Sequence, residues 1–367
     1  MSSYTRKQYR LGDVKPGMEV GKDVLTDSGQ IMLLEGIVLT EAIIEGLDCW
    51  DISSIYIREK VEAKEEPTPV KVEAPIKAEI PLSENQQKFY NNYDDTTNTI
   101  KSAFENMRYF KEAPLEEMKE LSDNAIFPML ESIGVINNLH MVRRQNDYTF
   151  HHSVNVAVIC GVLGKWLGYT KANLSDLVLA GLLHDIGKTQ IPLEILDKPD
   201  KLTTKEMEIM QTHTTLGYKL IKENKILSPS ILYAILQHHE RMDGSGYPFK
   251  IKADKIHDFA KIIAVADTYD AMTSNRVYHS KVTPFAVVET MAGDMYNKLD
   301  PTICTVFLNN VRNYFIGNTV KLDDGRSAEV VFLGQFMGTR PTVCTQDGEF
   351  IDLERNKNIR IVELMEA

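Results

Sequence analysis

Cysteine is scarce in this sequence and is not paired in any motif. Its four cysteines are spread over 367 residues with no CxxC pair; they are Cys49, Cys160, Cys304 and Cys344. Such spacing argues against a disulfide framework and against a cysteine-ligated zinc site. It favours a reducing compartment, so we expect the protein in the cytoplasm.

Long apolar segments are also absent. No run of residues is long and apolar enough to cross a bilayer, and the polar segment MSSYTRKQYR at the start is not typical of a signal peptide. The sequence therefore predicts no membrane partner. It also contains no internal repeat, no P-loop and no dinucleotide fingerprint.

Basic residues are fewer than acidic residues in this sequence. The chain has 41 Lys and Arg residues against 52 Asp and Glu residues, which gives a formal net charge of −11. A general nucleic-acid binder usually carries a basic face, so neither DNA nor RNA is expected as a partner. An anionic substrate would need a confined site in which metals or local cations reverse the sign.

The composition changes sharply near residue 61. Residues 1–60 read as a small mixed α/β domain, with β-prone runs at Gln30–Leu34 and Ser54–Ile57 around a helical stretch that starts near Thr40. Residues 61–82 alternate Lys, Glu and Pro without a helical or strand period. Such a segment cannot bury a core, so an extended linker is predicted.

The remaining residues divide into a helical part and a β part. From 83 to 317 apolar residues recur at helical spacing, as in Val154–Leu167, Leu174–His184 and Thr204–Ile221. In residues 318–367, Asp324–Gly325 and Asp347–Gly348 each lie between β-prone runs and predict hairpins in a small β domain. The expected fold class is therefore mainly α, with small α/β N-terminal and small β C-terminal appendages.

A polar pair, His184 and Asp185, follows a run of small and apolar residues in the segment AGLLHDIGK. A buried carboxylate needs a partner, and a metal is an efficient one, since a carboxylate can bridge two cations. Lys188 follows Asp185 by three residues, so a continuing helix places it on the same face. For the pair alone, the alternative is a helix-capping histidine beside an ion-paired aspartate.

Other histidines and one more aspartate share this placement at a helix end or in an apolar stretch. They are His152, His213, His238, His239 and Asp267. Five imidazoles and two carboxylates without a thiolate suit two divalent metals that share a bridging ligand, with Fe, Mn or Zn favoured. The alternative is a set of seven unrelated buried polar residues.

The segment Asp243–Pro248, DGSGYP, has the composition of a turn. Its two glycines allow backbone N–H groups to approach a ligand closely. An ordinary connecting loop explains the same composition equally well.

Five motifs occur in order between Asp147 and Pro301: YTxxHS, LLHDIGK, HTxxG, HHExxDGSGYP and ADxYDAMTSxR. Together they resemble the HD-GYP family of HD-domain phosphohydrolases. The resemblance implies a helical HD-domain bundle with its motif core at 147–301. It also implies a metal-dependent phosphodiesterase that hydrolyses cyclic di-GMP to pGpG, a product that many members of the family hydrolyse onward to GMP.

The resemblance also implies a role for each motif residue. One metal would be held by His152, His184, Asp185 and Asp267, and the second by the bridging Asp185 with His213, His238 and His239. The metals would be Fe or Mn, with Zn, Ni or Co as alternatives, and a hydroxide bridging them would attack the phosphorus. Asp185 and Lys188 are the catalytic residues on this reading. The residues expected to contact the substrate are Lys188, Gly246, Arg276 and His279.

Three positions depart from the family pattern. Tyr148 stands where some members have a glutamate that holds a third metal, so two metals are expected. The usual RPYR segment is RVYH here, with His279 in place of a cation, which makes one phosphate contact weaker or pH-sensitive unless Lys281 replaces it. Of the adjacent His151 and His152, we choose His152 as the ligand because it directly precedes Ser153.

Two alternative functions stay open. One is hydrolysis of another cyclic dinucleotide, such as a mixed GMP–AMP molecule, since no residue signals base specificity. The other is a non-catalytic dinucleotide sensor or scaffold that docks a GGDEF-type synthase through the loop Gly246-Tyr247-Pro248. The two appendages would act as a structural cap, as a homodimer contact or as a sensory module.

Overall fold

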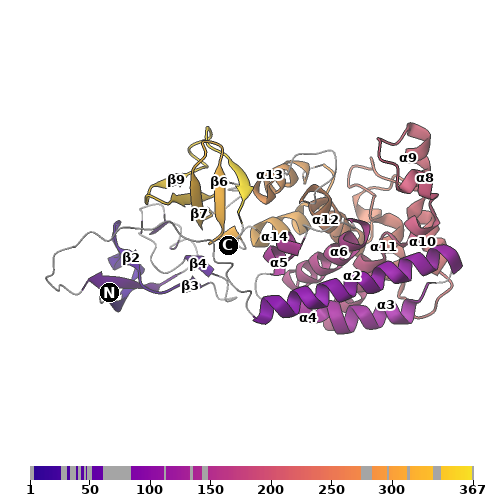
Figure 1. Ribbon diagram of the computed structural model, residues 1–367, viewed down its shortest axis with the longest axis horizontal. Coiled ribbons are helices and arrows are strands. Elements are labelled where there is room, and N and C mark those ends of the chain that lie inside the picture. The colour runs from indigo at the N-terminus through magenta and orange to yellow at the C-terminus, as the bar shows by residue number, and fades with distance from the viewer. Residues whose placement is uncertain are drawn as a thin grey trace, which may run out of the picture. The chain divides into compact units, whose positions relative to one another are not determined.

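The computed structural model describes most of the chain in two units. The described residues are 4–25, 31–33, 39, 43–44, 47, 52–60, 84–110, 113–132, 135–142, 148–273, 283–295, 297–311, 315–333 and 340–365. Contacts group residues 1–81 with 311–367 in one compact unit and residues 82–310 in the other (Figure 1). Each unit is described separately below.

The N-terminal part of the first unit is built from short strands. Strand β1 (Tyr4–Arg10) pairs antiparallel with β5 (Ser54–Lys60), and β2 (Glu19–Val20) pairs with β5 as well, which gives the order β1-β5-β2. A 3₁₀ turn, η1 (Leu11–Asp13), follows β1. Strands β3 (Val24–Leu25) and β4 (Ile31–Leu33) form a separate two-stranded sheet.

The C-terminal part of this unit is a five-stranded antiparallel sheet in the order β10-β6-β7-β8-β9. Its strands are β6 (Thr319–Leu322), β7 (Ser327–Phe332), β8 (Thr342–Thr345), β9 (Phe350–Asp352) and β10 (Ile361–Leu364). Both predicted hairpins are confirmed. Gly325 and Gly348 lie in the turns with φ of +91° and +86°, a conformation that glycine adopts without strain.

One apolar cluster joins the two ends of the chain. Val331 of β7 lies in a buried cluster with Leu33, Ile55 and Ile57, and Phe350 of β9 packs against it. Residues 1–60 and 318–367 are predicted as two domains, whereas their described residues share this core in the structure.

The second unit is helical, as predicted, and places helices far apart in sequence around one apolar centre. Its helices are α2 (Glu84–Phe110), α3 (Leu115–Leu121), the π-helical η2 (Ser122–Ile126), α4 (Phe127–Met129), α5 (Val135–Val142), α6 (Tyr148–Trp166), α7 (Lys171–Leu183), the 3₁₀ η3 (Ile186–Gln190), α8 (Leu193–Leu196), α9 (Thr204–Gln211), α10 (His213–Ile221), α11 (Pro229–Gln237), the 3₁₀ η4 (Ala253–Lys255), α12 (Asp258–Thr273), α13 (Pro284–Asp294) and α14 (Pro301–Val311). The mainly α fold class is therefore confirmed.

Helices α6, α7 and α12 form the centre of this unit. All three are apolar on nearly every face, and α6 packs against both α7 and α12. Gly181 of α7 allows close approach, because a Cβ there would lie 3.0 Å from the Cα of Ala157 on α6. This approach fixes the end of α7, where His184 follows, beside the start of α6, which carries His152. Among the described residues, no helix has the length and apolar character needed to span a membrane.

Candidate metal centre

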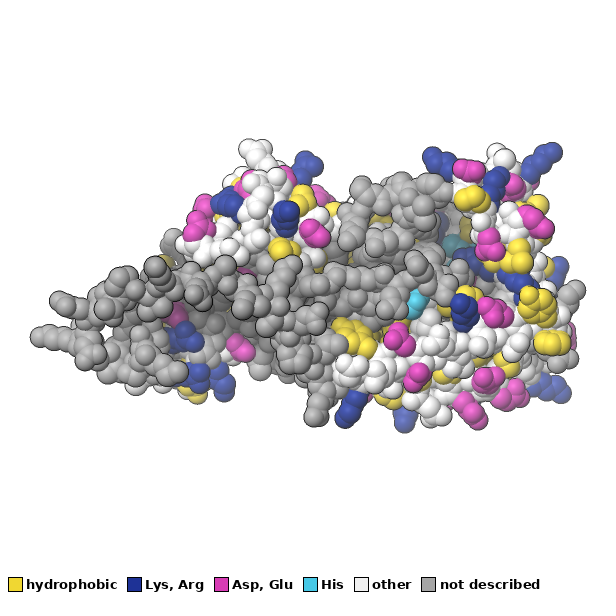
Figure 2. Space-filling model, viewed as in Figure 1, with side chains coloured by type: hydrophobic (Ala, Val, Ile, Leu, Met, Phe, Trp, Pro, Cys, Tyr) yellow, Lys and Arg dark blue, Asp and Glu magenta, His cyan; other side chains and the backbone are white. Residues whose placement is uncertain are grey.

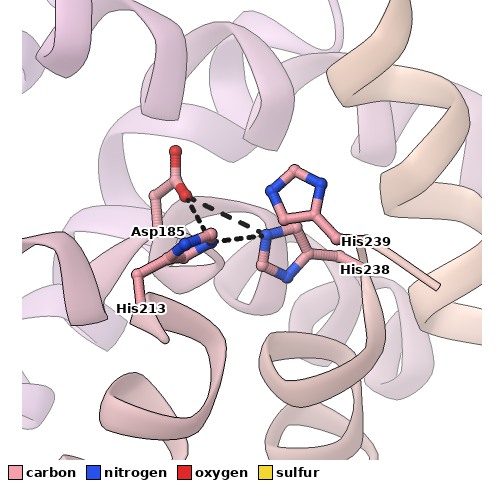
Figure 3. Close-up of side chains that lie close together, drawn as sticks. All are labelled: Asp185, His213, His238 and His239. Atoms are coloured by element: carbon pink, nitrogen blue, oxygen red, sulfur yellow. Dashed lines mark hydrogen bonds and ion pairs between the residues drawn. The ribbon is translucent and has the colours of Figure 1, made fainter. Parts of the chain in front are cut away.

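Asp185 lies where the ends of α7, α10 and α11 meet. Its Oδ1 is 3.3 Å from His213 Nε2 and 3.9 Å from His238 Nε2, and those two nitrogens are 3.4 Å apart. Figure 3 shows Asp185, His213, His238 and His239 turned toward one another. One ligand atom from each of the four lies within 4.8 Å of the others.

A second group shares Asp185 on its other side. Asp185 Oδ2 lies 3.2 Å from His184 Nε2 and 3.7 Å from His152 Nε2. Asp267 lies beside both groups, with Oδ1 3.2 Å from His152 Nε2 and Oδ2 3.9 Å from His239 Nδ1. All seven residues predicted as metal ligands are thus brought together, in two groups that meet at Asp185. By contrast, His151 belongs to neither group and stacks on Tyr93, with ring centroids 5.6 Å apart.

Backbone carbonyls orient three of these imidazoles. In His184, His213 and His238, Nδ1 lies 2.7, 2.8 and 2.9 Å from the carbonyl oxygen three residues earlier. A neutral imidazole that donates from Nδ1 keeps the lone pair on Nε2. That lone pair points into the group in each case, which is the arrangement a metal ligand requires.

Two buried atoms in this centre have no hydrogen-bond partner. They are His184 Nε2 and Asp185 Oδ1. An imidazole nitrogen and a carboxylate oxygen left unsatisfied inside a protein are costly, so native structures rarely keep them. A divalent cation would satisfy both, and the set of imidazoles and carboxylates around them suits one. We therefore identify this cluster as a divalent-metal site.

Electrostatics favours the protonation states that metal binding needs in one carboxylate and three imidazoles of the centre. Burial favours the neutral form of Asp185, but the ammonium of Lys188, 2.6 Å away, and the nearby His184 hold the pKa of that carboxyl well below its usual range. Burial lowers the pKa of His213 to about 4 and lowers the pKa values of His238 and His239 as well. Ionised carboxylates and neutral imidazoles are metal ligands.

Asp270, which is not among the predicted site residues, contacts His152 at Nδ1, the ring nitrogen that is not the predicted metal ligand. Its Oδ2 lies 2.7 Å from His152 Nδ1, while its Oδ1 accepts a hydrogen bond from the side-chain amide of Asn155 at 2.9 Å. The hydroxyl of Tyr93 on α2 donates to Asn155 at 2.7 Å. The signal was present in the sequence, because Asp270 follows Asp267 by three residues in the same apolar helix and so lies on the same face.

Burial would lower the pKa of His152, but the hydrogen bonds and charges of Asp267 and Asp270 together raise it well above its usual value. His152 therefore differs from the other imidazoles of the centre, because it is held between two carboxylates. A cation at Nε2 would take the place of a proton there.

One motif glycine, Gly187, allows the centre to close. A Cβ on Gly187 would lie 1.9 Å from the carbonyl oxygen of His213 and 2.5 Å from the backbone nitrogen of Gly217. No larger residue fits between η3 and the start of α10 without displacing one of them. Gly187 thus determines how closely His213 approaches Asp185.

The DGSGYP loop folds back onto the histidine pair. The buried carboxylate of Glu240 accepts hydrogen bonds from the backbone N–H groups of Phe249 (2.7 Å) and Ile251 (3.1 Å). A Cβ on Gly246 would lie 2.3 Å from the carbonyl oxygen of His239, so this glycine is required for close packing. The ring of Tyr247 stacks on His239 with centroids 4.6 Å apart.

The remaining predicted substrate contacts fall in different places. Lys188 lies at the edge of the centre with its side chain 26% exposed. Arg276 and His279 lie outside the described residues, as does Lys281. Among the residues that the structure describes, histidine shows on the face drawn in Figure 2 in small patches.

Comparison with known proteins agrees with this geometry. The family model of the HD domain matches residues 129–303. A cyclic di-GMP phosphodiesterase of Pseudomonas aeruginosa is 32% identical over 232 residues, which are 63% of this chain and 56% of the relative. A cyclic di-GMP phosphodiesterase of Thermotoga maritima is 36% identical over 181 residues, 47% of this chain and 48% of the relative.

Another relative has a different stated substrate. A 3'3'-cGAMP-specific phosphodiesterase of Vibrio cholerae is 34% identical over 178 residues, 48% of this chain and 41% of the relative. The chain thus spans about half the length of the curated relatives it matches.

Among solved structures, the HDG"Y"P protein Bd1817 of Bdellovibrio bacteriovorus aligns with 84% of this chain and 100% of its own, with a TM-score of 0.51 and 16% identity. This likeness shows a shared fold. The motif order, the matched HD domain and the curated relatives make this chain similar to the HD-GYP family of HD-domain proteins.

Proposed function

We propose that this protein is a metal-dependent phosphodiesterase that hydrolyses cyclic di-GMP to pGpG and onward to GMP. The observation that carries the proposal is the complete cluster around Asp185, with Lys188 at its edge. The names of relatives from Pseudomonas aeruginosa and Thermotoga maritima support the same substrate.

The donor set suits two divalent ions, and we propose that they are Fe or Mn. His152, His184 and Asp267 would hold one ion, and His213, His238 and His239 the other, with Asp185 shared between them. Bound there, they would supply a Lewis acid for the phosphoryl oxygens and make hydroxide available near neutral pH.

The chain's own residues bind and orient the phosphodiester. The neighbouring Lys188 and His184 hold the pKa of Asp185 well below its usual range, so its carboxylate would serve as a metal ligand rather than as a proton donor. Lys188 would offset the charge on the phosphoryl oxygens and protonate the departing sugar oxygen as the P–O bond breaks. The side chain of Lys188 is partly exposed, so a substrate that enters from solvent can reach its ammonium.

The direct test is turnover by anaerobically purified protein loaded with Fe(II) or Mn(II). We expect pGpG and GMP as products by chromatography, together with about two metal ions per chain. The double variant His184→Ala/Asp185→Ala should lose both metal and activity. Normal turnover by that variant would contradict the proposal.

A second candidate substrate is a mixed GMP–AMP cyclic dinucleotide. The similarity to the 3'3'-cGAMP-specific enzyme of Vibrio cholerae favours it. Measuring kcat/KM for the two substrates side by side decides between them, because the better substrate has the larger value.

A non-catalytic scaffold that docks a GGDEF-type synthase through Gly246-Tyr247-Pro248 has less support. The Tyr247 ring stacks on His239 and so faces the metal centre, and Phe249 is the exposed aromatic residue next to the loop, at 57%. Protein that contains no metal and hydrolyses nothing after anaerobic iron loading would favour the scaffold.

A further inference from the structure

His152 is held in a different way from three other imidazoles of the metal centre. In His184, His213 and His238 the Nδ1 atom meets the backbone carbonyl three residues earlier, so the local turn sets the ring. In His152 the Nδ1 atom meets the side chain of Asp270 at 2.7 Å, and the two residues lie on different helices. The orientation of His152 therefore depends on how other helices pack against its own.

A chain of hydrogen bonds continues from Asp270 to helix α2. Asp270 Oδ1 accepts from the side-chain amide of Asn155 at 2.9 Å, and Asn155 Oδ1 accepts from the hydroxyl of Tyr93 at 2.7 Å. Tyr93 belongs to α2, Asn155 to α6 and Asp270 to α12, and all three residues are buried. Side chains from three helices thus meet on the Nδ1 side of His152.

The carboxylate of Asp270 sets the direction of these bonds. An ionised carboxylate only accepts hydrogen bonds, so Asn155 turns its NH₂ group to Asp270 and its carbonyl oxygen to Tyr93. The Tyr93 hydroxyl then has to donate. Without that hydroxyl the Asn155 oxygen would lose the partner that the structure gives it, and an unpaired buried acceptor is costly. The amide would shift to recover a bond, and Asp270 would shift with it.

Aromatic contacts keep the Tyr93 hydroxyl in place. The ring of Tyr93 stacks on Phe89 of the same helix, with centroids 6.1 Å apart, and on His151, with centroids 5.6 Å apart. His151 Nδ1 also lies 3.2 Å from the Tyr93 hydroxyl oxygen. A side chain whose ring is already packed holds its polar group in position for the next residue. His151, which belongs to neither ligand group, thus helps to place Tyr93.

We infer that Tyr93 is a positioning residue for the metal ion that His152 would hold. It acts through Asn155 and Asp270, and it does not itself contact the ligand atom. His152 Nε2 lies 3.2 Å from Asp267 Oδ1, so a small rotation of the imidazole changes how the two ligands converge. The inference rests on the two-ion centre of the proposed function and not on its substrate.

This role makes α2 part of the metal centre. Helix α2 ends at Phe110, before residues 129–303, which the HD domain model matches. The matched segment contains all seven predicted ligands, whereas the hydroxyl that orients one of them comes from outside it. A displacement of α2 against α6 would therefore weaken one ion and leave the other in place.

The test is Tyr93→Phe, which removes the hydroxyl and keeps the ring. We expect it to weaken Mn(II) binding at one of two sites about threefold to tenfold, less than the loss of a direct partner of a ligand causes, and to leave the other site unchanged. Titration of the metal-free protein with Mn(II) under electron paramagnetic resonance measures both sites, because free Mn(II) and a Mn(II) pair give different signals. Tyr90→Phe is the matched control, since the Tyr90 ring lies on the same helix and also contacts Phe89, and it should change neither site.

A double-mutant comparison separates positioning from general destabilisation. Because Tyr93 acts through Asp270, Tyr93→Phe should have no further effect on Mn(II) binding in the Asp270→Asn background. Asn155→Leu, which removes the middle of the hydrogen-bond chain, should weaken the same site as Tyr93→Phe.

The outcomes separate this role from the proposed function. Equal weakening of both sites, no weakening at either, or the full effect of Tyr93→Phe in the Asp270→Asn background overturns the positioning role. Wild-type protein that shows the selective loss on Tyr93→Phe but hydrolyses no cyclic dinucleotide overturns the proposed function and leaves the role of Tyr93 intact. Wild-type protein that binds no Mn(II) overturns both.

Discussion

Asp270 is fully buried between His152 and Asn155 and holds the His152 ring by a 2.7 Å contact at Nδ1. A carboxylate behind a ligating imidazole fixes the ring and raises its basicity, and its loss commonly weakens metal binding 10- to 100-fold. We expect Asp270→Asn, which keeps the shape of the side chain, to weaken metal retention by about that factor.

The measurement is metal affinity by competition with a chelator, followed by turnover at rising metal concentration. Excess metal should restore most of the activity, because Asp270 acts through His152 and does not itself face the substrate. Unchanged metal affinity in Asp270→Asn would contradict the positioning role.

Gly187 allows a contact that no other residue permits. A Cβ there would lie 1.9 Å from the carbonyl oxygen of His213, and the neighbouring atoms are backbone, which cannot move aside cheaply. We expect Gly187→Ala to lower the free energy of unfolding by more than about 2 kcal/mol and to remove metal from the His213 side.

Gly293→Ala is the matched control for this variant. Gly293 lies exposed in the helix α13, and a Cβ there meets nothing within 4 Å. Alanine at that site should stabilise the protein by about 0.5–1 kcal/mol, since glycine loses more backbone entropy in a helix. Urea unfolding of both variants checks the opposite signs, and equal effects would contradict the clash at Gly187.

Several elements of the helical unit could be predicted because their signals are local. The apolar run Val154–Leu167 coincides with most of α6, and Leu174–His184 lies almost wholly within α7 and its cap. The points at which one helix ends and the next begins were harder to predict. The stretch expected as one helix from Thr204 to Ile221 divides at Thr212 into α9 and α10, which places His213 at a helix start.

The segment after His184 shows why the site could be predicted although the local structure differed. Helix α7 ends at Leu183 and the chain continues as the 3₁₀ turn η3, not as a longer α-helix. Residues three apart lie on one side of either helix, so Lys188 still reaches Asp185. The sequence places Asp270 on the same helix face as Asp267, but its contact with His152 could not be predicted, because the two residues lie on different helices.

The start of α9 is held by a capping box that gives a pH-dependent prediction. The Thr203 side chain accepts from the Glu206 N–H, and the Glu206 carboxylate accepts from the Thr203 N–H at 2.7 Å. Thr203→Ala should cost about 1 kcal/mol of stability at neutral pH, as measured by urea unfolding. A cost near zero would show that the cap contributes nothing in this context.

The same cap should weaken in acid. The Lys198 ammonium and the hydrogen bonds from Thr203 lower the pKa of Glu206 from 4.5 to about 2. Because the folded pKa is the lower one, the stabilisation is complete above about pH 4.5 and is lost as the pH falls toward 2. The stability difference between the wild type and Glu206→Gln should therefore shrink between pH 5 and pH 2. Glu208→Gln, at an exposed glutamate of the same helix outside the box, should show no such trend.

At the scale of the whole molecule, the sharing of one core by the two chain ends was not predictable from local patterns. Strand alternation and Asp-Gly turns identify β5, β6 and β7 one at a time, but nothing in a local window relates β7 to β5. Val331 nevertheless lies 1% exposed in the cluster that contains Ile55 and Ile57. Burial of this kind depends on contacts between residues more than 250 positions apart in the chain.

This shared core predicts that a change near the C-terminus loosens the N-terminal strands. Val331→Ala removes two methyl groups from the cluster and should destabilise the unit by about 2 kcal/mol. Hydrogen exchange should then accelerate in β1 and β5 as well as in β7, because the three strands depend on the same buried residues. Exchange in α6 and α7 should stay unchanged, since they belong to the other compact unit. Val362→Ala, at a valine 45% exposed on β10, is the control and should alter neither set. Faster exchange confined to β7 and its neighbours in the five-stranded sheet would mean that the two ends fold independently, and residues 1–60 would then need a core of their own.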